Sequence, residues 1–282
     1  MSVKVEPPAR IGQATLPDGR RLGWAEWGPR DGRPVLFCPG AGTSRSLGFG
    51  AGVAERLGIR LVSLDRPGLG ASDPSPGRSL MDWPRDVRDA GLDGIPVVGF
   101  SQGGPFALAC AAAGVAARVA IVSGADEVAA PEFRDGLPAE LRGLVDSVAG
   151  DPVAAEEFFA RFTPDALWDM IVPGGPEEDR AVYEDPAFER AYRRAMAEAF
   201  QQGPDGYARD TVLAMGRWPF DLGRVTVPVE LWYGELDHGH SPDRGATLAQ
   251  RIPGTRRHLV PGVGGAVLWT HAEPILRALA GG

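Results

Sequence analysis

A serine stands in the middle of a G-x-S-x-G pentapeptide at residues 99–103 and could act as a nucleophile. The pentapeptide belongs to the apolar segment 95–104, and a run of small residues over 105–117 that favours a helix follows it. A sharp turn between strand and helix needs small neighbours around the serine. It also places Ser101 at the helix N-terminus, where backbone N–H groups and the helix dipole stabilise developing negative charge. The alternative, an ordinary turn with an incidental serine, fits this order of strand, turn and helix less well.

Apolar segments without polar alternation recur in both terminal parts of the chain and predict a parallel sheet. Strands that are apolar throughout must be covered on both faces, which is typical of a parallel sheet with helices on each side. Asp18-Gly19 indicates the turn of an N-terminal hairpin over 11–28. The predicted buried strands lie within 34–40, 60–73, 95–104, 116–126, 227–237 and 255–262.

The segment 127–224 carries many helix signals and few strand signals. Three dipeptides within it, Asp151-Pro152, Thr163-Pro164 and Asp185-Pro186, pair an N-cap residue with proline at the first helical position. We therefore expect an α/β core domain, residues 1–126 and 225–282, interrupted by a helical cap, residues 127–224. One helix over 266–280 is expected to end the core.

The net charge of the chain argues against nucleic acid and anionic membranes as binding partners. Among the 282 residues, acidic and basic side chains are interspersed and the net charge is -8. Nucleic acid and anionic membrane surfaces both attract basic faces, so neither is expected to bind. No apolar run is long enough to cross a bilayer, and the N-terminus does not resemble a signal peptide. The oligomeric state is left open.

The two cysteines, Cys38 and Cys110, stand in apolar contexts. Such positions favour reduced, packed thiols in a cytoplasmic protein over a disulfide. Lys4 is the sole lysine, and alanine, glycine and proline are abundant, which is typical of a GC-rich bacterial genome.

Four motifs, in order, resemble those of the α/β-hydrolase family over essentially the whole chain. "PVLFCPGAGTSR" (34–45) is similar to that family's oxyanion loop, and "LVSLDRPGLGASD" (61–73) to the segment after its next strand. "VVGFSQGG" (97–104) resembles the nucleophile elbow, and "LWYGELDHGHSP" (231–242) the acid loop. The resemblance implies a mostly parallel twisted sheet flanked by helices, with the cap inserted where 127–224 lies.

The resemblance also implies roles for individual residues. Ser101 would be the nucleophile and Asp237 the acid that orients the base, with Asp126 as the rival for the acid role. The oxyanion donors would be the backbone N–H groups of Ala41 and Gln102.

The oxyanion loop departs from the family's usual His-Gly, because Pro39-Gly40 stand there; backbone donors do not depend on that side chain. Gly40 would lie against the substrate. Trp168 and Trp218 could line a substrate pocket under the cap, although aromatics in helical patterns more often belong to a core. Arg66 is expected to have a structural role in its loop.

The family's general-base histidine is missing from its expected place. It would follow the last strand in a G-x-G-H pattern, but residues 262–265 read Gly-Val-Gly-Gly, so Gly265 occupies the base position. His271 is about 9 Å further along a helix, and His258 lies inside the last strand. His238 and His240 share the loop of Asp237 and could swing into the vacant space.

Three hypotheses remain. The intact elbow, acid loop and oxyanion loop favour a serine hydrolase for an ester, thioester, lactone, amide or similar acyl bond of a small molecule, impaired because its base is replaced by Gly265. The second is a non-hydrolytic ligand-binding protein or catalyst of the same fold. The third is a hydrolase with His238 or His240 as a relocated base. No cofactor is implied, because phosphate-binding fingerprints are absent and His238-x-His240 beside Asp237 could form only a partial metal site.

Overall fold

The apolar segments pair into one sheet in the computed structural model, which describes residues 5–172 and 175–281. Over those residues the sheet has eight strands in the order β1-β2-β4-β3-β5-β6-β7-β8. The strands are β1 (Arg10–Thr15), β2 (Arg21–Trp27), β3 (Arg33–Cys38), β4 (Ile59–Leu64), β5 (Ile95–Phe100), β6 (Ala116–Val122), β7 (Val229–Gly234) and β8 (Arg256–Val260).

The strand directions agree with the parallel sheet that the continuous apolar segments predict. The pairs from β3 to β8 are parallel, whereas β2 pairs antiparallel with both β1 and β4. The β1–β2 hairpin turns at Asp18-Gly19, and Gly19 has φ 89°, a conformation that glycine adopts without strain. The predicted fold class, a mostly parallel sheet flanked by helices, is confirmed.

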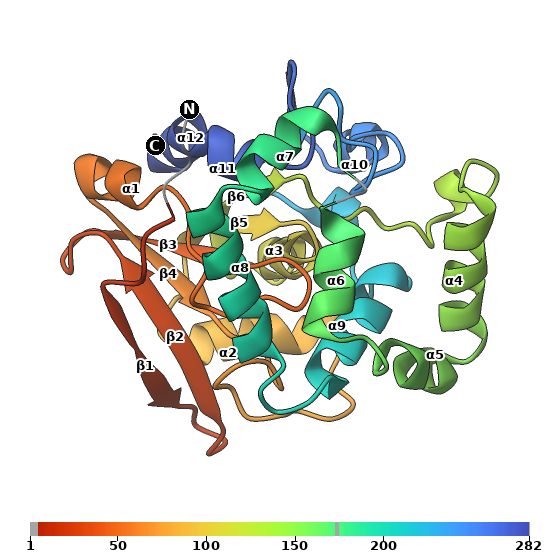
Figure 1. Cartoon of the computed structure of the whole chain (residues 1–282), viewed down its shortest axis with the longest axis horizontal. Helices are drawn as coiled ribbons and strands as arrows, with labels where there is room; N and C mark the ends of the chain where they lie inside the picture. The colour runs from red at the N-terminus through yellow and green to blue at the C-terminus, as the bar shows by residue number, and fades with distance from the viewer. Residues whose placement is uncertain (1–4, 173–174, 282) are drawn as a thin grey trace.

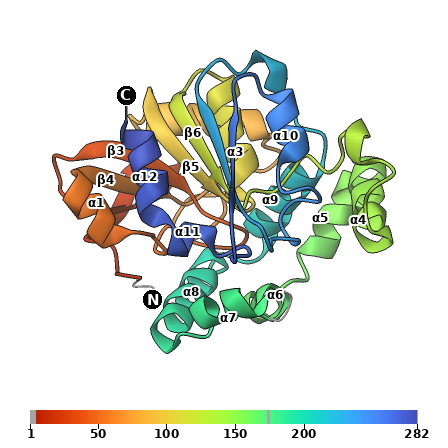
Figure 2. The ribbon, with the colours of Figure 1, turned by 90° about the horizontal axis from the view of Figure 1, so that it is seen from above.

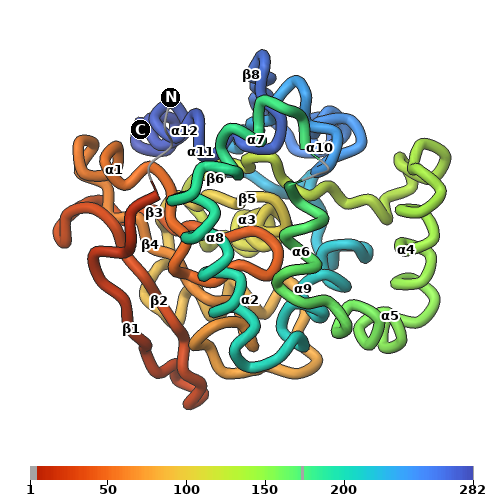
Figure 3. Tube along the Cα trace, viewed as in Figure 1, coloured from red at the N-terminus to blue at the C-terminus, as the bar shows by residue number. Residues whose placement is uncertain are grey.

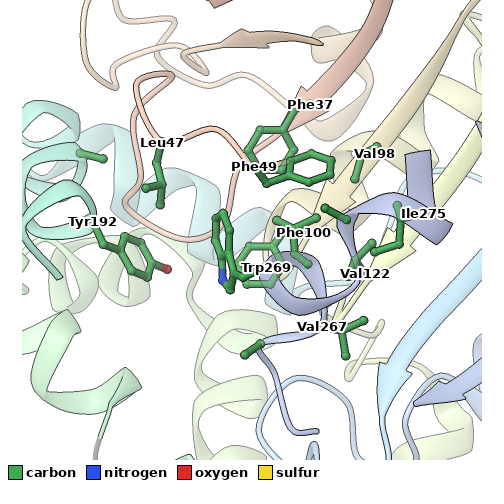
Figure 4. Close-up of a cluster of buried hydrophobic side chains, with 14 of the residues drawn as sticks. Phe37, Leu47, Phe49, Val98, Phe100, Val122, Tyr192, Val267, Trp269 and Ile275 are labelled. Atoms are coloured by element: carbon green, nitrogen blue, oxygen red, sulfur yellow. The ribbon is translucent and has the colours of Figure 1, made fainter. Parts of the chain in front are cut away.

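Helices cover both faces of the sheet, as Figure 2 shows. One face packs against α1 (Ala51–Leu57), α11 (Val267–Thr270) and α12 (Ala272–Ala280), and the other against α2 (Trp83–Asp89), α3 (Gly103–Ala112) and α10 (Ala246–Arg251). Each face has its own cluster of buried apolar side chains. In the first cluster Trp269 of α11 meets Phe100, the residue before Ser101, with ring centroids 5.5 Å apart (Figure 4). The core packing thus reaches directly to the serine.

Helices also fill the chain between β6 and β7. They are α4 (Ala139–Gly150), α5 (Pro152–Phe159), α6 (Pro164–Ile171), α7 (Glu177–Tyr183), α8 (Pro186–Ala199) and α9 (Asp205–Met215). Asp151, Thr163 and Asp185 each accept a hydrogen bond from a backbone N–H in the first turn of α5, α6 and α8, as their sequence context predicts. Figure 1 shows α6, α7 and α8 grouped beside the core, with α4 and α5 at the end away from β1. All six helices lie within residues 127–224, the segment predicted to be the cap.

The short 3₁₀ helices are η1 (Leu80–Asp82), η2 (Pro131–Phe133) and η3 (Leu222–Arg224). In the described ranges 5–172 and 175–281, no helix is both long enough and apolar enough to span a bilayer. Cys38 and Cys110 are free and buried, and burial raises the pKa of the Cys38 thiol to about 12.

The prediction of one continuous helix over 266–280 is wrong. The chain breaks at His271 into α11 and α12. Pro274 explains the break, since a continuous helix would need its missing N–H to donate to the carbonyl of Thr270. The short α11 that results carries Trp269 onto Phe100.

Candidate active site

Ser101 lies on a tight turn between β5 and α3, with φ 50°. This left-handed conformation costs a non-glycine residue about 1–3 kcal/mol and persists only where the surroundings impose it. A β-carbon at Gly99 would come within 2.7 Å of the carbonyl oxygen of Gly103, and one at Gly103 would overlap the carbonyl of Cys38. The glycines of the pentapeptide are therefore required by the close approach of α3 to β3 and β5.

Asp237 follows β7 and forms a hydrogen-bonded pair with His240. Its carboxylate is buried and accepts from the backbone N–H groups of Gly239 and His240, both at 3.2 Å. The Nδ1 atom of His240 lies 3.0 Å from Oδ1 and 3.1 Å from Oδ2. Burial alone would raise the pKa of Asp237, but the charge and hydrogen bonds of His240 outweigh it and lower the pKa to about 2.

The same pair sets the state of the imidazole. Burial opposes the charged ring, but Asp237, with a smaller contribution from Asp179, raises the pKa of His240 above its ordinary value. Asp237 is ionised and can only accept, so we assign the ring proton to Nδ1. Nε2 is then the lone-pair nitrogen of the neutral ring, as a general base requires.

His240 fills the space beside Gly265. A β-carbon built at position 265 would lie 2.5 Å from Cε1 of the imidazole and 2.9 Å from Nδ1. The ring also packs against Phe100, with centroids 5.9 Å apart. Thus the position expected to supply the base is empty of a side chain, and an imidazole from the acid loop stands next to it.

The other three histidines contact neither Asp237 nor Ser101 by a hydrogen bond. His258 stacks on Trp232 at 3.9 Å and bonds to Glu230 at 3.0 Å. His271 pairs with the hydroxyl of its neighbour Thr270 at 2.9 Å. His238 is exposed and lies 3.4 Å from Arg244.

Ser101 and His240 face one cavity of about 630 Å³. Within the described part of the chain, neither Ser101 Oγ nor His240 Nε2 has a hydrogen-bond partner, and no bond joins the two. Such bonds are often long in a ligand-free site and tighten when substrate binds. The cavity is lined by Ala41, Phe100, Ser101, Leu167, Met170, Ile171, Gly175, Pro176, Asp179, Tyr183, Tyr192, Leu236, Asp237, His238, Gly239, His240 and Gly265.

The loop after β3 lies against the serine. A β-carbon at Gly40 would sit 3.4 Å from Cβ of Ser101, and Ala41 lines the cavity. Among residues 5–172 and 175–281, no backbone carbonyl accepts from the N–H of Ala41 or Gln102 outside regular helices and strands. Both N–H groups are therefore available to an oxyanion. The Gln102 side chain turns away and donates to Thr211 Oγ1 at 3.0 Å.

Arg66 fixes that loop from behind. It is fully buried and donates to the carbonyls of Pro39 at 2.7 Å and Gly40 at 3.1 Å. Its Nε donates to Asp210 of α9 at 2.5 Å. The guanidinium therefore ties the loop after β3 to α9 and lies outside the lining of the cavity.

Asp126, the rival acid, is not hydrogen-bonded to His240. Its carboxylate accepts from Ser241 Oγ at 3.0 Å and from the N–H of Glu127 at 2.9 Å. Burial raises its pKa to about 7.

Neither predicted tryptophan lines the cavity. Trp168 packs on Tyr192, with centroids 5.7 Å apart, and Trp218 stacks on Phe220. Leu167, adjacent to Trp168 on α6, faces the cavity instead, because successive helical residues point about 100° apart. The sequence prediction also omitted Asp179, which the structure places in the cavity wall. No motif marks this residue.

In the part of the chain that the structure describes, no three or more His, Cys, Asp or Glu side chains are grouped so as to hold a metal ion. The pair His238 and His240 therefore gains no further ligand there. The site consists of a strained serine, an imidazole–carboxylate pair and free backbone donors around one cavity. That set matches the parts required for acyl transfer.

This fold and this site define an α/β hydrolase, and comparison with known proteins agrees. Residues 35–278 match the alpha/beta hydrolase family, so the chain belongs to that family. It is 33% identical over 250 residues to a non-heme chloroperoxidase of Streptomyces lividans, covering 80% of this chain and 82% of that protein.

Solved structures share the fold at lower identity. A bromoperoxidase from Bacillus anthracis superposes with a TM-score of 0.67 at 19% identity, over 96% of this chain and 99% of that one. A thermophilic esterase from Thermogutta terrifontis gives 0.67 at 21% identity, over 96% and 97%. An enol-lactonase from Burkholderia xenovorans LB400 gives 0.66 at 18% identity, over 95% and 98%.

Proposed function

We propose that this protein is a serine hydrolase that cleaves an ester, lactone, thioester, amide or similar acyl bond of a small molecule, with His240 as its general base. The observation that carries the proposal is the His240–Asp237 pair, whose ring fills the space beside Gly265 and faces the same cavity as Ser101. The hypothesis of a site left without a base has less support, because an oriented imidazole is present. The alternative of a non-hydrolytic protein of the same fold is an outcome of the test below.

In the proposed mechanism His240 acts first as general base and then as general acid in each half-reaction. Nε2 of His240 takes the proton of Ser101 while Oγ attacks the acyl carbon, and the carbonyl electrons move onto its oxygen. The N–H groups of Ala41 and Gln102 stabilise that oxyanion. The oxyanion collapses, the bond to the leaving group breaks, and His240 returns the proton to that group. Water then attacks the acyl-enzyme by the same route, releasing the acid and Ser101.

The cavity suits neutral substrates of moderate size. Its cap side consists largely of apolar and aromatic side chains from α6, α7 and α8, including Leu167, Ile171 and Tyr192. Two carboxylates, Asp179 and Asp237, line it, and no arginine or lysine does so among the described residues. The two carboxylates would repel an anionic group of the substrate and no cationic Arg or Lys side chain in that lining would attract it, so we place neutral esters and lactones first. Relatives whose names read esterase and enol-lactonase agree with this choice.

The domain division and the location are part of the proposal. The core would comprise residues 1–126 and 225–282, and the cap 127–224 would roof the cavity. The net charge of -8 and two buried free thiols support a cytoplasmic protein that binds neither nucleic acid nor membrane. No cofactor is required by the mechanism.

Hydrolysis of p-nitrophenyl esters of several chain lengths tests the proposal. Ser101→Ala and His240→Ala should each lower kcat by at least about 10³-fold, since triad members act as a unit. His238→Ala, on the same loop, is the matched control and should cost far less. Labelling of Ser101 by a fluorophosphonate should slow in His240→Ala in parallel. Full activity in His240→Ala would exclude it as the base. A wild-type protein that is inert to esters and fluorophosphonate but binds a small acyl ligand would favour the non-hydrolytic alternative.

A further inference from the structure

Asp179 of the cap holds the backbone that lies beside His240. Its Oδ1 accepts from the N–H of Gly264 at 3.0 Å, and its Oδ2 from the N–H of Ala266 at 3.3 Å. The carboxylate is buried, with 3% of the residue exposed. Figure 3 shows α7 passing over the chain that leads into α11. A cap residue thus binds the two residues on either side of Gly265.

The same loop is fixed from the sheet side. The carbonyl of Val263 accepts from the N–H of Leu236 at 3.0 Å, and a β-carbon at Gly234 would overlap the carbonyls of Val263 and Gly264. On the cap side, a β-carbon at Gly264 would overlap Asp179 and Pro176. Residues 263–266 are therefore clamped between the end of β7 and α7, and Gly265 at their centre presents its backbone to the His240 ring.

Within the described part of the chain, no cationic side chain pairs with Asp179. No salt bridge to it occurs among residues 5–172 and 175–281, and its hydrogen bonds come from backbone N–H groups. Burying a carboxylate without a cationic partner costs free energy, so its position has to be stabilised by other contacts. Burial raises its pKa, while the N–H donors of 264–266 act in the opposite direction.

We propose that Asp179 is a positioning residue of the hydrolase: it fixes residues 263–266 as the wall for His240, and its charge stabilises the imidazolium that forms when His240 accepts the Ser101 proton. This inference rests on the proposed function and extends it to the cap. It makes the cap part of the catalytic apparatus, because the base is held in place from outside the α/β core.

Among the residues that the structure describes, the charged and titratable groups that line the cavity with His240 come from three elements. Its own loop supplies Asp237 and His238, α7 supplies Asp179 and Tyr183, and α8 supplies Tyr192. Burial raises the pKa of both phenols, to about 12 for Tyr192, so they remain neutral in the working range. Asp179 and Asp237 both raise the pKa of His240. Removing Asp179 should therefore lower the pKa of the ring.

Three variants separate the charge of Asp179 from its hydrogen bonds. Asp179→Asn removes the charge and one of the two acceptors, Asp179→Glu keeps the charge on a longer chain, and Glu178→Gln removes an exposed charge from the same helix. The readouts are kcat/KM against pH, with active sites counted by fluorophosphonate, and the NMR titration of the His240 ring. The second readout does not depend on activity.

Asp179→Asn should lower kcat/KM at pH 8 by about 10- to 100-fold, since a small displacement of a catalytic group can cost about 100-fold. It should also move the acid limb of the profile and the His240 titration to lower pH. Asp179→Glu should lose rate but keep the titration near that of the wild type, and Glu178→Gln should leave both unchanged. An equal loss of rate at every pH, with an unchanged titration, would reduce Asp179 to a structural role and overturn the inference.

Gly264→Ala tests the contact between Asp179 and residue 264 from the loop side. This variant replaces Asp179→Asn in the experiment if Asp179→Asn does not fold. Its added methyl group would displace the Asp179 carboxylate, so kcat/KM should fall, and an unchanged kcat/KM would overturn the inference. Failure of the proposed function is recognised separately. Full activity in His240→Ala rejects His240 as the base, whereas an inactive His240→Ala beside an unaltered Asp179→Asn rejects only the role of Asp179.

Discussion

The imidazole of His240 and a side chain at position 265 would compete for one space. The ring's Cε1 lies only 2.5 Å from where a β-carbon of residue 265 would stand, and Asp237 holds the ring there through Nδ1. The His240 ring can therefore occupy this position only because residue 265 is glycine. The proposed acid and the proposed base both come from one loop, three residues apart, whereas the family's pattern takes the base from the loop after the last strand.

This relationship predicts strong non-additivity between positions 240 and 265. Gly265→His alone should not improve the enzyme, because it overfills the site; overpacking of this kind costs about 1–3 kcal/mol. Gly265→His combined with His240→Gly should recover much of the activity that His240→Gly loses. Thermal unfolding and kcat/KM of the four proteins form a double-mutant cycle that measures the coupling. A gain of orders of magnitude from Gly265→His alone would instead show that His240 is not the working base.

The acid role is predicted to belong to Asp237. Asp237→Asn should lower kcat by about 10³- to 10⁴-fold, because an amide no longer fixes the ring tautomer or stabilises the imidazolium. Asp126→Asn should keep most of the activity, since Asp126 bonds to Ser241 and Glu127 rather than to His240. Steady-state kinetics at pH 8 decide between the two carboxylates. The assignment is reversed if the loss falls on Asp126→Asn.

Asp126 is instead predicted to govern the pH dependence of stability. Its folded-state pKa of about 7 lies above the ordinary aspartate pKa of 3.8, so between these values the folded state binds more protons than the unfolded state. The stabilisation from this protonated carboxyl is fully present below about pH 4 and is lost as the pH rises through about 7. Asparagine does not titrate.

The difference in Tm between Asp126→Asn and wild type should therefore rise in favour of the variant from pH 4 to pH 8. Asp146→Asn, which replaces an exposed carboxylate, is the control. A difference that stays flat for Asp126→Asn would show that its carboxyl is ionised in the folded protein throughout this range.

The fold could be predicted because its signals are local. Continuous apolar runs predict strands buried on both faces, and the pentapeptide around Ser101 allows only a tight strand-to-helix turn. The prediction of one helix over 266–280 is wrong at His271, because the segment reads as a single helical stretch in sequence whereas Pro274 cannot continue the hydrogen bonding of α11. The correct predictions of the strands and the wrong prediction of the last helix all rest on patterns among residues that are close in sequence.

The site was less predictable because it depends on contacts between distant residues. Sequence alone left His238 and His240 equivalent, and only the loop geometry turns His240 onto Asp237. Trp168 and Leu167 are neighbours, and packing of α6 decides which one reaches the cavity. Asp179 belongs to no motif; its role arises from backbone donors at Gly264 and Ala266, some eighty residues later.

Arg66 donates to the carbonyls of Pro39 and Gly40 and is predicted to support the proposed oxyanion loop through them. Arg66→Lys keeps the charge but cannot reach both carbonyls and Asp210 with one planar group, so the Ala41 donor should shift. Disturbing a buried ion pair should also lower stability, by up to about 3–5 kcal/mol. Arg78→Lys is the matched control, because Arg78 pairs with the same Asp210 but does not contact Pro39 or Gly40.

Both variants should lower Tm, but only Arg66→Lys should weaken binding of a boronic acid that mimics the tetrahedral intermediate, in proportion to its loss of kcat/KM. Equal weakening in both variants would mean that the ion-pair cluster acts only through stability. An unaltered boronic acid affinity in Arg66→Lys would mean that the donors of Ala41 and Gln102 are positioned without the guanidinium.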